Sequence, residues 1–493
     1  MELLYILAFP IFTMLVIMLA PARQSRIMAL VGSVLQLVSI FWLYFSFKEA
    51  RIASHTAPLL FEYNQSWFPS MGIDFHIGVD GISIAMMLLT SLVAIAGVLV
   101  SWNIELLKKE FFFFLHLLAF GAYGFFISQN LILLFFFLEI AVVPKYLFIS
   151  IWGSGNKNYS ANKLALMLML GSALILIGIL VLFFSLPLEQ RTFDLIQLAQ
   201  LHIPLTLQHW VFPLVFLGFG IFTAMFPFHT WVPDGHSSAP TAGSMFLAGI
   251  SMKLGGYGAL RTALYIFPDG AREFANIIIV LATIAIIYGA FATMMQKDLK
   301  YINAYSSISH TGFVLLGLGM LTKTAIVGAI MQMVSHGLMT ALFFAIIGMV
   351  YERTHTKYVA EMGGLIKVMP FIMTCMFIAG FASLGLPGLS GFVAEMTIFI
   401  GSWEYPDVFH RTATVIAAMS IVVTAVYILR AVGKVSMGPL GPQVIERNDA
   451  KWNEQLAAGL LIAGILAMGL APFWLNELIT PGVNIITNKL AGK

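Results

Sequence analysis

Charged side chains are scarce in this chain, and cysteine is almost absent. Only 10% of the 493 residues are Asp, Glu, Lys or Arg, whereas a soluble globular domain has about 25%. The single cysteine, Cys375, excludes a disulfide framework and a thiolate metal cluster within the chain. No histidine spacing matches a motif such as HExxH, so no metal site is expected. Because 60% of the residues are hydrophobic, the composition indicates a polytopic membrane protein.

The hydrophobic residues are grouped in runs of about 20, the length that crosses the hydrocarbon core of a bilayer. Lipid offers the backbone no hydrogen-bond partner, so each run is predicted to be helical. The sequence therefore predicts an all-α polytopic membrane protein that forms a single membrane domain over residues 1–493. Fourteen transmembrane helices are expected, at about 3–20, 28–47, 79–102, 111–128, 130–152, 163–186, 210–231, 239–266, 274–295, 301–321, 324–350, 368–400, 410–432 and 456–478.

Lysine and arginine are distributed unevenly between the two sets of loops. Of the 26 basic residues, fifteen fall on one side, eight on the other, and three within spans. Cytoplasmic loops carry the excess of Lys and Arg in membrane proteins. We therefore predict that the side with fifteen basic residues is cytoplasmic and that both termini lie outside, which in a bacterial inner membrane is the periplasmic side.

Two of the predicted spans are interrupted. The seventh contains Pro227 and continues into the polar segment HTWVPDGHSSAPT, and the twelfth contains SLGLPGLSG. Proline removes a helical hydrogen bond, and glycine tolerates unwound backbone. The five-span separation predicts two inverted five-helix repeats, spans 4–8 and 9–13, and interrupted helices at matching positions point to a transport site. The corresponding divisions are residues 1–110, 111–266, 267–434 and 435–493.

Two carboxylates and two lysines lie within predicted spans where an ordinary membrane protein carries no charge: Glu139, Lys145, Lys253 and Glu395. A charge at the bilayer centre costs about 2.5–3.5 kcal/mol on insertion scales, and such residues usually serve ion or proton movement. Glu139 could instead be a structural carboxylate, Glu395 could lie near the membrane surface, and Lys145 could extend to an interface. Lys253 is too far from either end of its span for its side chain to reach an interface. On an ideal helix Lys145 points about 120° away from Glu139, unless Pro144 bends or unwinds the helix.

Several histidines lie in or beside spans, and histidine titrates near neutral pH. We expect His310 and His336, in SSISH and MVSHGL, to relay protons. His229 and His236 are secondary candidates for the same role. A hydrogen-bonded structural histidine is the alternative for all four.

Seven segments resemble the antiporter-like subunits of respiratory complex I: GVDGISIAMMLLT (78–90), FFFLEIAVVPKYLFISIWG (135–153), FPFHTWVPDGHSSAPT (226–241), AGISMKLGGYGALR (248–261), DLKYINAYSSISHTGFVLLG (298–317), MVSHGLMTALFF (333–344) and LPGLSGFVAE (386–395). The resemblance covers nearly the whole chain. It implies fourteen spans, inverted five-helix repeats with helices 7 and 12 discontinuous, and a polar axis along the mid-plane of the membrane.

Within this family, the residue in helix 12 separates the members, because subunit M has glutamate where subunits L and N and the Mrp antiporter subunits usually have lysine. Glu395 therefore points to the subunit M branch. The resemblance also implies that Glu139, Lys253, Glu395 and the central histidines carry protons. One position departs from the family, since Phe222 stands where helix 7 normally has a lysine. We hypothesise that Lys145 supplies the missing ammonium near Glu139.

The resemblance implies a proton-translocating, non-redox subunit of a bacterial NADH-quinone oxidoreductase, an enzyme whose electron transfer takes place in other subunits. It implies no cofactor bound by this chain, and partners that include subunits L and N, membrane lipid and protons, but no nucleic acid. The alternatives are a subunit of a Mrp-type Na⁺/H⁺ antiporter, a subunit of a membrane-bound hydrogenase complex, and a passive scaffold. Four intramembrane charges make a scaffold costly.

Overall fold

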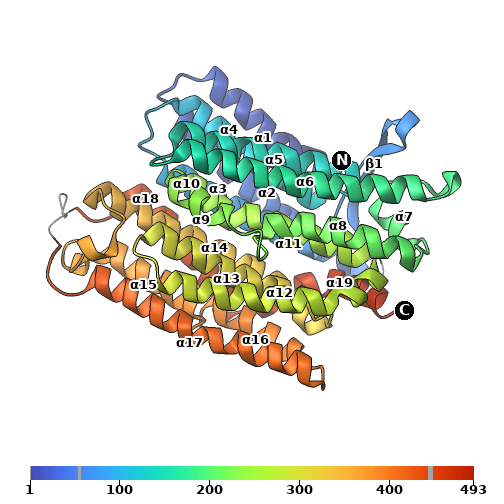
Figure 1. Ribbon diagram of the computed structural model, residues 1–493. Coiled ribbons are helices and arrows are strands. Elements are labelled where there is room, and N and C mark those ends of the chain that lie inside the picture. The colour runs from blue at the N-terminus through green and yellow to red at the C-terminus, as the bar shows by residue number, and fades with distance from the viewer. Residues whose placement is uncertain (1, 54–56, 442–447, 493) are drawn as a thin grey trace.

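The computed structural model describes residues 2–53, 57–441 and 448–492, which form a bundle of helices aligned along a common direction (Figure 1). Arg447 and Lys493, two of the basic residues that predicted the orientation, lie outside the described residues. The first part of the bundle consists of α1 (Glu2–Leu19), α2 (Ser25–Ala53), α3 (Gly81–Val100), α4 (Lys108–Ile127), α5 (Leu131–Trp152), α6 (Lys157–Ser185), α7 (Leu195–Gln200), α8 (Leu205–Thr223), α9 (Trp231–Ser238), α10 (Thr241–Phe246) and α11 (Met252–Gly258).

Two π-helical segments, η3 (Leu247–Ser251) and η4 (Ala259–Leu264), flank α11 and continue its helix. The predicted span 239–266 is therefore one rod of α10, η3, α11 and η4. The second part of the bundle consists of α12 (Pro268–Met294), α13 (Leu299–Gly319), α14 (Lys323–Thr354), α15 (Pro370–Leu384), α16 (Ser390–Trp403), α17 (Val408–Ser436), α18 (Trp452–Leu470) and α19 (Phe473–Leu490).

Within the described residues, eleven helices are long and apolar enough to cross a membrane: α1–α6, α8, α12, α14, α17 and α18. Three of the fourteen predicted spans are not in this set. The span at 239–266 is divided by its π-helical segments, and the span at 368–400 is divided into α15 and α16. The third, α13, carries many polar side chains, among them Asn303, Ser307 and His310.

Both predicted interruptions are present. Helix α8 ends at Thr223, with Ala224 in the left-handed conformation at φ +65°, and α9 begins only at Trp231. Helix α15 ends in the same way at Gly385, at φ +74°, and α16 begins at Ser390. Glycine is required here, because a Cβ on Gly391 would lie 2.1 Å from the carbonyl oxygen of Ala382.

Polar side chains fix the starts of three other helices of the bundle. Asp80 accepts a hydrogen bond from the Ser83 amide at the start of α3, and Asn130 accepts from the first amides of α5. Asp298 caps α13 in the same manner. A side-chain acceptor at this position satisfies backbone donors that have no partner within the helix.

Two elements correct the predicted architecture. A β-hairpin of β1 (Leu60–Phe68) and β2 (Ile73–Val79) pairs antiparallel, with Asn64 opposite His76, so the all-α prediction is wrong there. The predicted last span, 456–478, is also wrong at its end, because α18 stops at Leu470 and α19 begins at Phe473. The N-terminus, the hairpin, α7 and the C-terminus lie toward the same end of the bundle (Figure 1).

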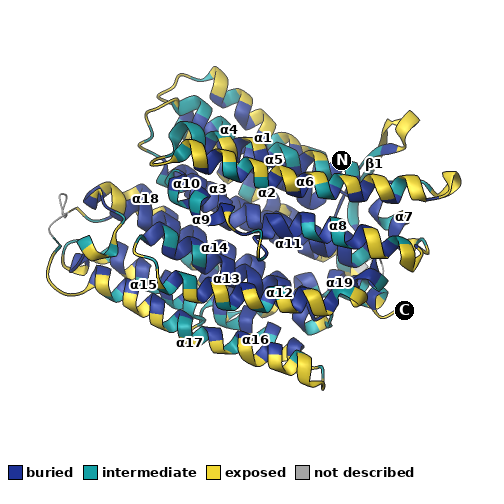
Figure 2. Cartoon of the chain, in the orientation of Figure 1, coloured by how far each residue is buried: buried dark blue, intermediate teal, exposed yellow. Residues whose placement is uncertain are grey.

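Burial separates an inner group of helices from an outer one. Figure 2 shows α11, α13 and α14 mostly buried, whereas α6, α12 and α17 carry exposed outer faces. Those outer faces are apolar, with Leu166 68%, Phe184 63% and Val422 68% exposed. Apolar surface of this extent suits lipid or a neighbouring subunit. The polar residues of α11, α13 and α14 are therefore held inside the protein.

Candidate functional site

Four of the predicted residues form a continuous row across the centre of the bundle, here called the central polar row. Lys253 on α11 lies 2.6 Å from Nδ1 of His336 on α14. The rings of His336 and His310, on α13, are 5.5 Å apart between centroids. Nδ1 of His310 is 3.2 Å from Oε1 of Glu395 on α16. All four side chains are at most 3% exposed, so the structure brings together groups from four helices.

The helix irregularities position both ends of this row. Lys253 follows η3, and its ammonium donates a second hydrogen bond to the Ala248 carbonyl at 2.5 Å. Glu395 lies on the first turns of α16, and Oε2 is 3.0 Å from where a Cβ on Gly385 would stand. The break between α15 and α16 thus admits the carboxylate between helices. Glu395 is 3% exposed and therefore faces the protein interior rather than the outer surface of the bundle.

Side chains that sequence reasoning missed complete the surroundings of His310. Nε2 of His310 is 3.0 Å from the hydroxyl of Ser383. The amide nitrogen of Gln332 is 3.4 Å from Nδ1 of the same ring. Ser383 belongs to the SLGLPGLSG segment, and Gln332 precedes His336 by one helical turn, which is the only signal the sequence offers. The Ser383 contact at Nε2 leaves Nδ1 of the ring directed toward Glu395.

Glu139, Lys145 and Phe222 form a second group, here called the α5 cluster. Lys145 is fully buried, and its ammonium lies 5.5 Å from the centroid of the Phe222 ring, within cation–π range. Among the described residues, neither Lys145 Nζ nor Glu139 Oε1 has a hydrogen-bond partner. Helix α5 is unbroken at Pro144. Lys145 therefore does not extend to an interface, and it reaches the position of the missing lysine without bonding Glu139 directly.

The secondary candidates lie off the central polar row. His229 packs on Phe226, with ring centroids 5.5 Å apart, and its Nδ1 finds no partner in the described part of the chain. His236 is fully buried and stacks on Phe344. Neither nitrogen of His236 has a hydrogen-bond partner in the part of the chain that the structure describes. These contacts therefore do not indicate a hydrogen-bonded structural role for His236.

Lys300 was predicted to lie in a loop, and the structure places it inside the protein. It is the second residue of α13, is 5% exposed, and donates to the Ala239 carbonyl at 2.6 Å. His236 lies within electrostatic reach of both Lys300 and Lys253. The loop assignment fails because the Asp298 cap starts α13 before the hydrophobic run begins.

A polar cavity of about 630 Å³, here called the polar vestibule, opens beside Lys300 between the start of α6, α9, the start of α13 and the end of α14. Asp234 in its wall pairs with Lys163 at 2.7 Å and accepts from the Tyr301 hydroxyl at 3.0 Å. Lys357 donates to the Ser237 carbonyl at 3.2 Å. Burial raises the pKa of Asp298 and lowers that of Lys357. Both shifts move the pKa of the group toward neutral pH, where it can exchange a proton more readily.

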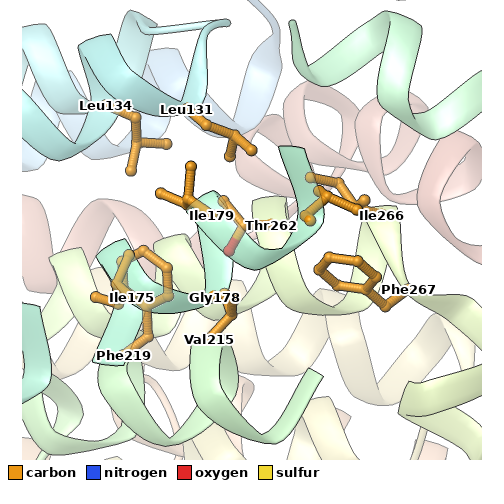
Figure 3. A pocket seen from close by; sticks show the side chains of 11 residues that line it. Leu131, Leu134, Ile175, Gly178, Ile179, Val215, Phe219, Thr262, Ile266 and Phe267 are labelled. Carbon is orange, nitrogen blue, oxygen red and sulfur yellow. The ribbon is translucent and has the colours of Figure 1, made fainter. Parts of the chain in front are cut away.

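A smaller cavity between α5, α6, α8 and η4 has the opposite character (Figure 3). Its volume is about 10 Å³, and its lining is apolar apart from Thr262. That hydroxyl is already bonded to the Gly258 carbonyl at 2.7 Å. A space of this size and chemistry stays dry, so it does not extend the central polar row.

Toward the hairpin end of the bundle, the helix that carries Lys253 presents Tyr257 and then Arg261. Arg261 forms an ion pair with Asp80, the cap of α3. The Tyr257 hydroxyl donates to the Phe126 carbonyl at 2.7 Å. An arginine keeps its proton in proteins, so a fixed positive charge separates Lys253 from this end. Among the described residues, no group of three or more His, Cys, Asp or Glu is arranged to hold a metal ion.

Solved structures share this fold along the whole chain. A chain of respiratory complex I from Thermus thermophilus superposes with a TM-score of 0.89 at 24% identity, covering 99% of this chain and 100% of that one. A chain of the Mrp complex from Dietzia sp. gives 0.85 at 18% identity, with 99% and 97% covered. At these identities the likeness concerns the fold.

Sequence comparison narrows the family. Residues 128–424, more than half of the chain, match the family described as NADH:quinone oxidoreductase/Mrp antiporter, TM. NAD(P)H-quinone oxidoreductase chain 4 1 of Synechococcus elongatus is 37% identical over 99% of this chain and 91% of that protein. NADH-quinone oxidoreductase subunit M of Rickettsia prowazekii is 37% identical over 91% and 90%. The resemblance predicted from the motifs is confirmed, and the chain belongs to the NADH:quinone oxidoreductase/Mrp antiporter membrane-subunit family, on the branch of subunit M and chain 4.

Proposed function

We propose that this chain is the proton-translocating subunit M of a bacterial NADH-quinone oxidoreductase, and that electron transfer takes place in its partner subunits. The observation that carries the proposal is the central polar row, in which lysine, two histidines and a carboxylate follow one another inside the membrane-spanning bundle. Buried ionisable residues in a membrane are costly and mark ion or proton pathways. The names of the curated relatives support the same enzyme.

Protons enter, in this proposal, from the polar vestibule. Asp298 and Lys357 lie at its wall, and Lys300 and His236 lead from there to Lys253. His236 suits the step between the two lysines because both of its ring nitrogens are free of other hydrogen bonds in the described structure. A free imidazole accepts a proton at one nitrogen and releases another from the second.

From Lys253 the proton passes to Nδ1 of His336 along the existing 2.6 Å contact. His336 and His310 are not joined by a hydrogen bond, and Nε2 of His336 has no partner in the described residues. A bridging water or a rotation of the ring therefore completes this step. His310 then delivers the proton to Glu395 at 3.2 Å. The histidine gap is the point at which conformational change can open or close the row.

The α5 cluster supplies the electrostatic input. A charge on Glu139 attracts the Lys145 ammonium, and loss of that attraction leaves Lys145 beside an apolar wall. Moving one charge against 100 mV needs about 2.3 kcal/mol, and one pKa unit corresponds to about 1.36 kcal/mol. Rearranging one such pair is therefore of the required magnitude.

The topology of the proposal has fourteen spans, with inverted repeats over spans 4–8 and 9–13 and both termini periplasmic. The two interruptions, at 224–230 and 385–389, support the repeats because they fall five spans apart. Subunits L and N are the proposed neighbours. A Na⁺/H⁺ antiporter shares the fold, but the curated relatives named above are quinone oxidoreductase subunits.

The proposal is tested by Glu395→Gln in the intact complex reconstituted in proteoliposomes. Glutamine keeps the size and a hydrogen-bonding oxygen but cannot take up the proton. We expect the number of protons moved per NADH oxidised to fall, while Glu404→Gln, at an exposed position after the last turn of the same helix, leaves it unchanged. Full pumping in Glu395→Gln would refute the role of the row.

A further inference from the structure

A basic cleft lies where α12 and α17 end, on the opposite side of α13 from the polar vestibule. Its volume is about 200 Å³, and its wall contains Lys297, Arg430 and Lys434. Among the described residues that line it, none is Asp or Glu. All three cations are exposed, so their charge is directed outward at one place.

These three cations differ from other basic residues of the chain. Lys163 and Arg272 each pair with a carboxylate. Lys297, Arg430 and Lys434 form no ion pair with any described residue. The ends of α12 and α17 expose carbonyl groups here, each end worth about half a negative charge. Three full positive charges exceed that, so the cleft remains attractive to an anion.

The surface that leads from this cleft toward the middle of the bundle is apolar. Helices α12 and α17 lie side by side (Figure 1), and their outer faces expose Phe291 by 49%, Val426 by 48% and Val422 by 68%. Met294 and Ala431 line the cleft itself. A cationic cleft that continues into an apolar face matches a molecule with an anionic head and a hydrocarbon tail.

We propose that this cleft binds the phosphate headgroup of an anionic phospholipid, whose acyl chains follow the surface between α12 and α17. Arginine presents a planar fork that matches phosphate, and lysine adds mobile point charges. Basic pockets between transmembrane helices bind anionic headgroups on this principle. The inference depends on charge, shape and membrane placement, and it is independent of the proton pathway.

The bound headgroup covers Tyr427, which lines the inner part of the cleft and donates to the Ser306 hydroxyl at 3.1 Å. Tyr427 itself is 3% exposed. The cleft therefore ends at a buried tyrosine that lies within electrostatic reach of Glu395.

The test compares Arg430→Gln/Lys434→Gln with a matched control, Arg23→Gln/Lys109→Gln, which removes the same charge from the α1–α2 turn and the start of α4. Each complex is exchanged into nanodiscs of phosphatidylcholine containing a minor fraction of cardiolipin, and retained lipids are counted by native mass spectrometry. We expect affinity to fall about fivefold for each basic residue removed. The double variant should lose one retained cardiolipin, and the control should lose none.

Equal lipid loss in both variants would overturn the proposal, because it would show a general effect of surface charge. Unchanged retention in the cleft variant would also overturn it. A third arm adds inorganic phosphate to the wild-type complex in phosphatidylcholine alone. Phosphate retained there in place of lipid would contradict a phospholipid ligand. Arg430→Lys/Lys434→Arg, which keeps both charges, should retain the lipid.

Discussion

The central polar row and the α5 cluster solve the same problem, a charge inside a membrane, in different ways. In the row, Lys253 and Glu395 each contact a histidine and are at most 3% exposed. In the α5 cluster, Lys145 faces an aromatic ring, and Glu139 is only partly buried. The row is continuous within this chain except for the gap between the two histidines, whereas in the α5 cluster neither Lys145 Nζ nor Glu139 Oε1 has a hydrogen-bond partner among the described residues.

This difference indicates separate tasks. The row can conduct a proton once its single histidine gap is bridged, whereas the electrostatic attraction between Glu139 and Lys145 is not fixed by a hydrogen bond and responds to changes in its surroundings. The α5 cluster is therefore suited to sense a neighbouring subunit, and the row to move the proton. Variants in the two regions should differ in whether they can be rescued.

The largest expected effect is that of Lys253→Met, which keeps the volume but removes the donor to His336. We expect this variant to abolish proton pumping by the reconstituted complex, a fall of more than about tenfold, which is equivalent to a barrier higher by at least about 1.4 kcal/mol. Lys323→Met, at an exposed position on α14, is the control and should pump normally. Pumping by an assembled Lys253→Met complex at the control rate would show that the row is not the pathway.

Lys145→Ala should abolish pumping as well, and this variant separates the two regions. Because the ammonium lies over the Phe222 ring, Lys145→Met/Phe222→Lys returns a cation to nearly the same volume. We expect this exchange to recover part of the pumping. No corresponding exchange exists for Lys253, whose contacts are directional. Near-normal pumping in Lys145→Ala would end the hypothesis that this lysine replaces the missing one.

A smaller effect is expected for Ser383→Ala, which removes the hydroxyl 3.0 Å from Nε2 of His310. One hydrogen bond contributes about 1 kcal/mol, so pumping should fall no more than about fivefold. Ser420→Ala, which removes a buried hydroxyl bonded to the Ala417 carbonyl, should leave pumping unchanged.

The smallest effect concerns the contact between His76 on β2 and Asp194, which lies beside the start of α5 and is here called the His76 clamp. Burial lowers the pKa of His76, but the hydrogen bond and charge of Asp194, with Glu62, outweigh it and raise the pKa above 6.5. The pairing therefore stabilises fully below about pH 6.5, and this stabilisation is lost as the pH rises through the raised value. The backbone carbonyl of His76 also accepts a hydrogen bond from the Gln129 amide, just before α5, at 2.9 Å.

Hydrogen exchange at residues 128–135 measures this clamp. The ratio of exchange rates between His76→Gln and wild type should be largest at low pH and approach one at high pH. Taking the ratio cancels the intrinsic dependence of exchange on pH. His209→Gln, at an exposed pair with Glu273, should give a ratio near one throughout. A constant elevated ratio for His76→Gln would show that the clamp does not titrate.

The main features of the site could be predicted from the sequence. A charge inside an apolar run is expected to be buried in the protein, so the positions of Lys253 and Glu395 in such runs were enough to predict them. The Pro- and Gly-rich segments predicted both breaks. Hydrophobicity could not identify the π-helical segments, which preserve the residue pattern while changing the hydrogen bonds. Hydrophobicity also did not predict the burial of Lys300, because the ammonium of this lysine bonds to the carbonyl of Ala239, which lies 61 residues earlier in the chain.

Other elements depend on tertiary contacts that local patterns do not encode. The hairpin at 60–79 is stabilised by pairing and by the His76–Asp194 contact, 118 residues apart. Helix α19 is separated from α18 by only Ala471 and Pro472, so a hydropathy average merges the two. Contacts of Gln332 and Ser383 arise only when α13, α14 and α15 meet.

The most direct test of proton transfer along the central polar row is the infrared difference spectrum of the intact complex before and after NADH addition, compared between wild type and Glu395→Gln. The account predicts a carboxylic-acid C=O band that changes in the wild type, is absent in Glu395→Gln, and persists in Glu404→Gln. A difference spectrum that keeps the same band in Glu395→Gln would contradict it, because Glu395 would then not exchange its proton during turnover.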